Sequence, residues 1–253
     1  MMQTVSDVLQ SFAGKEVSVN MEKRLAIPRN THKGHMFMQG GGTDGVYGYF
    51  AMNSGGDSRY SVTNIYKVDL DNWRIIQISD DLYMNHANDI AYDSKKNRLI
   101  VSHCDINPDH VSIVDPGSLR VIEEKIIPQC HFSIAYSPDK EMYVAGKSRT
   151  YDLVLLDESF QPVKLLAGVE GYIKQGLACD DRFIYFFQTG SDANWIFVFD
   201  WDGSLIHKIS IPMVGESENL FVRGDKMICA FNNHTQDLAE IYEVTFSPQE
   251  PME

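Results

Sequence analysis

The stretch His86-Ala87-Asn88-Asp89-Ile90-Ala91-Tyr92-Asp93, in the middle of the chain, decides the fold. It begins with polar side chains, becomes apolar and reaches a polar turn over residues 93–97, after which a second apolar run follows over residues 98–103. Short apolar runs bounded by turn residues are typical of antiparallel strands. The stretch therefore predicts a strand, a turn and a second strand, and the same pattern recurs along the chain.

Four other stretches align with this one at the residue that opens the turn. The five anchor residues are Asp44, Asp93, Ser137, Asp180 and Arg223. The steps between them are 49, 44, 43 and 43 residues. This spacing is close to the roughly 40–50 residues of a four-stranded propeller blade.

Further apolar runs follow each anchor and complete the predicted blades. Second strands are predicted over residues 47–52, 99–102, 142–145, 183–187 and 226–231. Third strands are predicted over residues 65–69, 111–115, 153–157, 196–200 and 241–245. Fourth strands are predicted over residues 73–78, 119–127, 162–166 and 205–211. β-Branched and aromatic residues dominate these runs, as short strands require.

The fifth repeat lacks a fourth strand, and the N-terminal residues 23–28 supply one. Their sequence, KRLAIP, mirrors KISIP at residues 208–212, in the fourth strand of the fourth repeat. A strand contributed from the N-terminus closes the ring and removes its free sheet edges. We therefore predict an all-β fold: a five-bladed β-propeller with four-stranded blades, in which an N-terminal strand closes the last blade. Residues 1–253 form one domain, and residues 1–14 form an N-terminal helix or cap.

Composition restricts the classes of partner. The 35 acidic residues exceed the 22 basic residues and give a net charge of −13. Since phosphate neutralisation needs clustered Lys and Arg, which this sequence lacks, we expect no nucleic-acid partner. No run reaches the roughly 18 apolar residues of a membrane span, and residues 1–14 do not read as a leader. The four cysteines show no metal-ligand spacing. We expect a soluble, cytoplasmic protein, and the oligomeric state is left open.

In four of the five repeats, a polar residue occupies an equivalent position just before the apolar part of the predicted inner strand. Five residues before the anchors stand Gln39, Asn88, Phe132, Gln175 and Glu218. Because inner strands line the central channel of a propeller, these side chains are expected at one mouth of the channel. Convergent polar groups in a concave site are typical of ligand binding. Ordered water is the alternative partner for such groups.

Two carboxylates near this mouth, Asp89 and Glu218, are a candidate acid/base pair. Like charges held close together raise one pKa, which suits proton transfer. His86 and His131 precede the inner positions of the second and third repeats and would assist or orient. The same carboxylates with Asn88 and Asn219 could hold a divalent cation such as calcium, so the cofactor is either none or such a cation. Alternatively, Asp89 accepts hydrogen bonds from backbone N–H groups of an adjacent blade.

Further polar residues are predicted near the same face of the ring. The substrate-binding candidates are Gln39, Asn88, Gln175, Gln188, Asn219, His35 and His103. Glu216 lies slightly outside the ring of inner positions, and Arg149 ends a second strand at a loop of this face. For those of these residues that lie in loops, the default interpretation is a solvated turn residue without a binding role.

A short segment resembles a known enzyme family. Gln175-Gly176-Leu177, followed by Tyr185-Phe186-Phe187-Gln188-Thr189-Gly190, is similar to the QGL and LYESTG segments of plant and bacterial-type glutaminyl-peptide cyclotransferases. The resemblance implies a five-bladed propeller that cyclises N-terminal glutamine. The catalytic glutamate of that family falls on Gln188, an amide that cannot act as an acid or base. The repeats also resemble YncE-like and lactonase-like propellers at the level of the fold.

Two hypotheses follow for function. The first is an enzyme or enzyme-like pocket in the channel mouth that acts on a small polar molecule or peptide terminus by cyclotransferase-, lyase- or hydrolase-like acid/base chemistry. The second is a non-catalytic ligand- or protein-binding propeller, lectin-like or an interaction scaffold. Lectin-like propellers repeat one binding motif in every blade, whereas the five equivalent positions here differ, which favours one central site.

Overall fold

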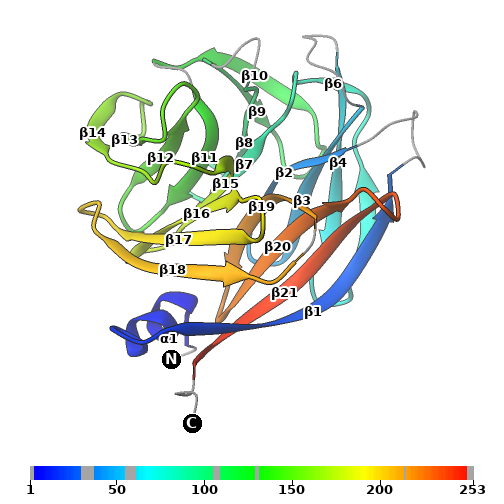
Figure 1. The fold of residues 1–253 in the computed structure, drawn as a ribbon. Coiled ribbons are helices and arrows are strands. Elements are labelled where there is room, and N and C mark those ends of the chain that lie inside the picture. The colour runs from blue at the N-terminus through cyan, green and yellow to red at the C-terminus, as the bar shows by residue number, and fades with distance from the viewer. Residues whose placement is uncertain are drawn as a thin grey trace.

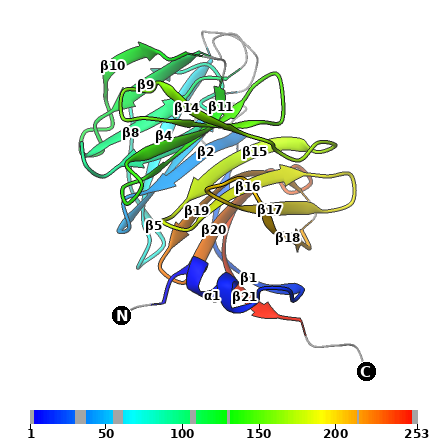
Figure 2. The same ribbon diagram turned by 90° about the vertical axis from the view of Figure 1, so that its left-hand side faces the viewer.

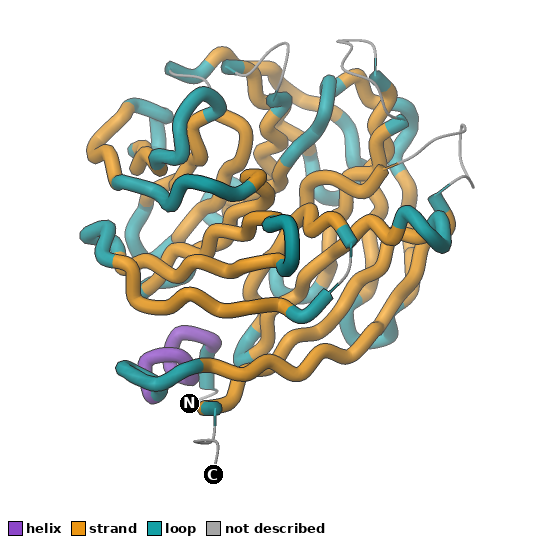
Figure 3. The backbone as a smooth tube through the Cα atoms, in the orientation of Figure 1, coloured by secondary structure: helices purple, strands orange, loops and turns teal. Residues whose placement is uncertain are grey.

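The computed structural model describes residues 3–29, 37–54, 61–104, 109–128, 131–213 and 215–249. Strands account for most of this chain, and one short helix lies at its N-terminal end (Figure 3). The strands form sheets arranged in a ring, with β2, β7, β11, β15 and β19 at its middle (Figure 1). The predicted five-bladed β-propeller is confirmed.

The blades follow one another along the chain. Blade 1 contains β2 (Phe37–Thr43), β3 (Tyr47–Asn53), β4 (Val62–Asp69) and β5 (Arg74–Ile78), with β6 (Leu82–Tyr83) paired to β4. Blade 2 contains β7 (Asp89–Asp93), β8 (Arg98–Ser102), β9 (His110–Val114) and β10 (Val121–Ile126). Blade 3 contains β11 (His131–Ser137), β12 (Met142–Lys147), β13 (Leu153–Leu156) and β14 (Pro162–Leu166). Blade 4 contains β15 (Ile173–Cys179), β16 (Phe183–Thr189), β17 (Asn194–Asp200) and β18 (Leu205–Ile211).

Blade 5 joins the two ends of the chain. Its strands are β19 (Glu216–Arg223), β20 (Lys226–Asn233), β21 (Leu238–Pro248) and the N-terminal β1 (Val17–Pro28). β1 runs antiparallel to β21 from the Val17–Pro248 pair to the Pro28–Leu238 pair. It is longer than the predicted residues 23–28, but the predicted closure of the ring is correct. This pairing removes the edge that β21 would otherwise expose.

The apolar core is divided among the interfaces between blades. Five clusters of buried hydrophobic residues occur, one between each pair of neighbouring blades. Successive residues of a strand contribute to opposite clusters: Tyr185 and Phe187 pack toward blade 5, and Phe186 packs toward blade 3. This alternation follows from the two-residue period of a strand. Both faces of each blade are thereby buried, which holds the inner strands in fixed positions.

Helix α1 (Val5–Ser11) covers the apolar cluster between blades 4 and 5 (Figure 2). A capping box starts the helix: the Thr4 side chain accepts the Asp7 backbone N–H, and the Asp7 carboxylate accepts the Thr4 N–H. Val5 and Leu9 are fully buried against the cluster. The helix has 7 residues, and no helix of the described chain is long and apolar enough to cross a membrane.

Candidate functional site

Where the five inner strands begin, a cavity of about 570 Å³ opens at one end of the channel. We call it the mouth pocket. All five side chains predicted at this mouth line it, together with His86 and residues of the surrounding loops. The lining residues are Gln39, His86, Asn88, Cys104, Phe132, Ser148, Arg149, Tyr151, Tyr172, Ile173, Lys174, Gln175, Glu216 and Glu218.

Irregularities in the inner strands place these side chains. The strand pairing shifts register at Gln39-Gly40 in β2, at Phe132 in β11, at Gln175-Gly176 in β15 and at Glu218 in β19. A β-bulge leaves its residue unpaired and redirects its side chain. Four blades therefore present the equivalent residue to the mouth by the same local device.

The glycines beside the bulges allow the inner strands to approach one another closely. A Cβ on Gly176 would lie 2.7 Å from the Asn219 Cα, and one on Gly40 would lie 2.7 Å from the Asp89 Cα. At either position, a side chain larger than glycine would clash with the backbone of the neighbouring inner strand. Gly40-Gly41-Gly42 thus serves close packing of blades.

Three amide side chains in the pocket are buried and have no hydrogen-bond partner among the described residues. Gln39 and Asn88 are each 8% exposed, and Gln175 is 6% exposed. Within the described part of the chain, no hydrogen bond reaches any of their side-chain amide groups, and all three line the cavity. Buried amides are normally hydrogen-bonded. Their donors and acceptors are therefore available to the contents of the pocket.

Glu218 is the buried carboxyl group of the pocket and is 3% exposed. Its Oε1 accepts a hydrogen bond of 2.5 Å from the Asn232 side-chain amide, which also bonds the backbone of Met38. No other hydrogen bond to this carboxyl occurs within the described residues, so one oxygen is available. Burial, and secondly the charge of Glu216, raise the pKa of Glu218 well above its ordinary value.

Asp89 lies one residue deeper and does not line the mouth pocket. Its Oδ1 accepts the Ile90 N–H at 3.0 Å, and its Oδ2 accepts the N–H groups of Ile134 at 3.1 Å and Leu177 at 2.9 Å. The Gly41 N–H also bonds this carboxyl. Burial raises the pKa of Asp89 to about 8, and the four N–H groups act in the opposite direction. Asp89 thus links four inner strands in the middle of the channel, which we call the waist. This is the structural role, accepting backbone N–H groups of adjacent blades, that the sequence offered as the alternative to catalysis.

The remaining predicted residues are distributed between pocket and scaffold. Asn219 donates to the Gln39 carbonyl at 2.5 Å, and Gln188 donates to the Val169 carbonyl at 3.3 Å; neither lines the pocket. His131 is buried against the Pro128 carbonyl at 2.7 Å. His103 bonds the Ser112 hydroxyl at 2.7 Å, and burial lowers the pKa of His103 to about 4. His35 lies outside the described residues.

The predicted pairs are consequently separated. The proposed acid/base pair is split, because Glu218 faces the mouth pocket and Asp89 is enclosed by backbone N–H groups. The proposed calcium ligands are split in the same way, with Asn88 and Glu218 in the pocket and Asp89 and Asn219 outside it. Among the described residues, no three His, Cys, Asp or Glu side chains are grouped as a metal site.

Lys174 is a pocket residue that sequence reasoning missed. Its ammonium group donates to the carbonyls of Lys147 and Ser148 at 2.7 Å and of Thr150 at 2.9 Å. It also lies 4.8 Å from the centre of the Phe132 ring. Burial lowers the pKa of Lys174. The sequence could have indicated Lys174, because it directly precedes Gln175. Tyr151 and Tyr172 also line the pocket, but they lie in loops whose positions the repeat does not predict.

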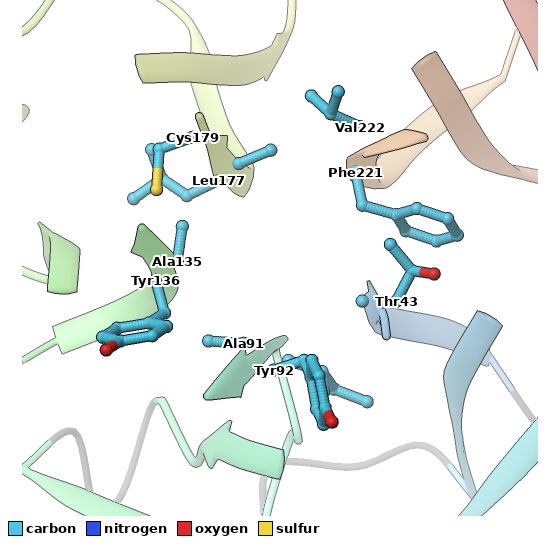
Figure 4. Close-up of a pocket in the computed structure, with 13 residues that line it drawn as sticks. Thr43, Ala91, Tyr92, Ala135, Tyr136, Leu177, Cys179, Phe221 and Val222 are labelled. Carbon is cyan, nitrogen blue, oxygen red and sulfur yellow. The ribbon is translucent and has the colours of Figure 1, made fainter. Parts of the chain in front are cut away.

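The opposite end of the channel is different in character. A cavity of about 100 Å³, the far pocket, lies where the inner strands end. Figure 4 shows Ala91, Ala135, Leu177 and Val222 around it, with Tyr92 and Tyr136 at its edge. Both tyrosine hydroxyls are already hydrogen-bonded, to Asn97 and Glu158. The far pocket is much smaller than the mouth pocket, and the polar atoms of its lining side chains belong to Thr43, Tyr92, Tyr136 and Cys179. A cavity of about 580 Å³ at the same end shares Thr43, Tyr92 and Tyr136 with it.

Comparisons with known proteins identify the fold. No family model matches the chain, and no curated protein matches its sequence. Among solved structures, glutaminyl cyclase of Myxococcus xanthus is similar, with a TM-score of 0.67 and 13% identity over 93% of this chain and 99% of that one. The PQQ-bound aldose sugar dehydrogenase of Streptomyces coelicolor has a TM-score of 0.59 and 11% identity over 93% and 100% of the two chains. At these identities the likeness establishes the fold alone.

Proposed function

We propose that the mouth pocket binds a small polar molecule or a peptide terminus and that Glu218 exchanges a proton with it. One observation carries this proposal: Gln39, Asn88 and Gln175 are buried around a cavity, yet their amide groups have no partner in the described chain. These amide atoms are accessible from the cavity, where ordered water is the alternative partner. A ligand that bears amide, amine or hydroxyl groups would take the place of water on them.

The neighbours of Glu218 support an acid/base role. An ordinary glutamate is ionised at neutral pH, whereas a carboxyl with a raised pKa keeps its proton to higher pH and can donate it. One oxygen is held by Asn232, and the other is available to a ligand. Cyclotransfer, elimination and hydrolysis at an amine or amide group all use such a proton transfer. The structural likeness to a glutaminyl cyclase makes cyclisation of a peptide N-terminus the first reaction to test.

Gln188, which occupies the position of the catalytic glutamate of the glutaminyl-peptide cyclotransferases, does not support cyclisation. Gln188 is fully buried, donates to the Val169 carbonyl and does not line the pocket. If this chain cyclises peptides, a carboxyl group of blade 5 must take that role, and Glu218 is the buried one in the pocket.

Binding without turnover is the second candidate. The enclosure of Asp89 favours it, because Glu218 then lacks the partner expected from the sequence, and the other carboxyl group of the pocket, Glu216, is bonded to the His234 ring. The five equivalent side chains differ from blade to blade, so either function uses one central site.

The test is incubation of the protein with a library of short peptides bearing free N-termini, followed by mass spectrometry for loss of ammonia, loss of water or addition of water. We expect wild-type protein to convert a subset and Glu218→Gln to convert it about 100-fold more slowly, the usual contribution of a general acid or base. Binding of peptides by both proteins without conversion would support the second candidate. Equal conversion by both proteins would contradict the role of Glu218.

A further inference from the structure

The charged side chains of the mouth pocket are divided between its two sides. Glu216 and Glu218 both belong to β19 of blade 5. Arg149 follows β12 of blade 3. In the ring, β19 contacts β15 and β2, while β11 contacts β7 and β15, so blade 4 separates blades 3 and 5 on one side. Arg149 therefore approaches the pocket from a blade that is not adjacent to the two carboxyl groups.

Lys174 holds the basic side in place without being available itself. Its ammonium group donates to the carbonyls of Lys147, Ser148 and Thr150, which surround Arg149 in the sequence. These three hydrogen bonds use all three of its protons. The charge of Lys174 adds to the positive potential of this loop, while its hydrogen bonds fix the loop conformation.

Arg149 is the available cation. Its side chain is exposed, lines the pocket and makes no hydrogen bond or ion pair within the described chain. A guanidinium group presents a planar fork of donors that matches the two oxygens of a carboxylate. The basic side therefore offers one specific contact for a ligand anion.

The acidic side suits an amine. Glu218 has one oxygen available to the cavity, and Glu216, partly exposed, bonds the His234 ring at 3.1 Å. Glu216 carries the negative charge that favours a protonated amine, and the bound ammonium group in turn favours ionisation of Glu218, whose proton then passes to solvent. Gln39, Asn88 and Gln175 lie around the same cavity and provide neutral donors and acceptors.

We infer, on the basis of the proposed function, that the mouth pocket takes a zwitterion of the size of an amino acid or dipeptide, with its amine toward Glu216 and Glu218 and its carboxylate toward Arg149. A cavity of about 570 Å³ is suitable for such a ligand, since small-molecule sites measure roughly 300–1,000 Å³. Phe132, Tyr151 and Tyr172 form the aromatic wall available to its side chain. The specificity-determining residue is Arg149.

The test uses dipeptides of the form Xaa-Gly, with Xaa each standard amino acid. Thermal shift identifies the strongest binder, and isothermal titration then compares its free, N-acetylated and C-amidated forms. We expect each modification to weaken binding about tenfold, the value of one hydrogen-bonded charge. Arg149→Gln should lose the preference for the free over the amidated form. Arg120→Gln, which removes the same charge from the exposed turn between β9 and β10, should keep it.

The outcomes separate this inference from the proposed function. If the amidated dipeptide binds as tightly as the free form, and Arg149→Gln changes nothing while Glu218→Gln abolishes binding, then the zwitterion inference is wrong and the proposed function stands. If no free dipeptide binds the wild-type protein at millimolar concentration, both are contradicted. Loss of the preference for the free carboxylate in Arg149→Gln alone supports the inference.

Discussion

The middle of the channel around Asp89 and the mouth pocket around Glu218 contain the two buried carboxyl groups that the sequence marked as a pair. Asp89 receives four backbone N–H groups from four inner strands. Glu218 receives one side-chain amide and has an oxygen left over. Burial raises the pKa of both carboxyls. A raised pKa therefore does not distinguish a functional group from a structural one, whereas the number of hydrogen bonds already made does.

The largest expected effect of this difference is on stability. Asp89→Ala removes the acceptor of four buried N–H groups, and each unsatisfied group costs roughly 1–3 kcal/mol, so we expect a loss of about 4 kcal/mol or more. Asp115→Ala is the matched control, because Asp115 accepts its hydrogen bonds from Ser118 in an exposed turn. Urea unfolding followed by tryptophan fluorescence measures both. Equal losses in the two variants would refute the waist role of Asp89.

Glu218→Gln should show the reverse pattern. The amide keeps an oxygen for Asn232, so we expect the free energy of unfolding to change by less than about 1 kcal/mol. Conversion or binding of a ligand should fall about 100-fold. Glu123→Gln, exposed on β10, is the control and should change neither quantity. A Glu218→Gln protein that loses stability as Asp89→Ala does would place Glu218 in the scaffold as well.

The close approach of inner strands gives a third, smaller effect. A Cβ on residue 176 meets the backbone of Asn219, so Gly176→Ala should lose about 1–3 kcal/mol of stability through overpacking. It should also weaken ligand binding, because Gln175 is the preceding residue. Gly117→Ala is the control, since its Cβ would have no contact nearer than 3.4 Å. Thermal unfolding of the two variants decides whether the blades are packed as described.

Taken per pH unit, the pH dependence of stability is the smallest effect, and it follows from Asp89. The folded-state pKa of about 8 exceeds the ordinary value of 3.8, so the folded protein retains a proton that the unfolded chain releases. The stabilising contribution is complete below about pH 4 and is lost as pH rises through about 8, with a slope of about 1.4 kcal/mol per pH unit between these limits. Unfolding in urea from about pH 5 to about pH 9 measures it. Asp89→Asn should flatten the slope, and an unchanged slope would contradict this assignment.

The fold could be predicted from the sequence because packing between blades imposes a regular repeat. The anchors Asp44 and Asp180 recur because each accepts two backbone N–H groups of a turn and a tyrosine hydroxyl from the next strand. The same alignment correctly placed Gln39, Asn88, Gln175 and Glu218 around one cavity. Equivalent positions in a repeat share a direction, which is why this part of the site could be predicted.

The remainder depends on local geometry that no repeat encodes. Asp89 follows Asn88 directly, yet the two side chains have opposite roles, because Asn88 precedes β7 and lines the pocket while Asp89 is the first residue of the strand. Lys174 and Arg149 contribute through a loop whose conformation is set by backbone carbonyls. Their approach to the pocket results from tertiary contacts, which composition and spacing do not specify.

The most direct measurement is a crystal structure of the protein soaked with the Xaa-Gly dipeptide that binds best. We expect the dipeptide in the mouth pocket, hydrogen-bonded to Gln39, Asn88 or Gln175 and to the available oxygen of Glu218, while the four N–H groups remain on Asp89. Density for ordered water alone in that pocket, or a dipeptide bound elsewhere on the propeller, would contradict the account.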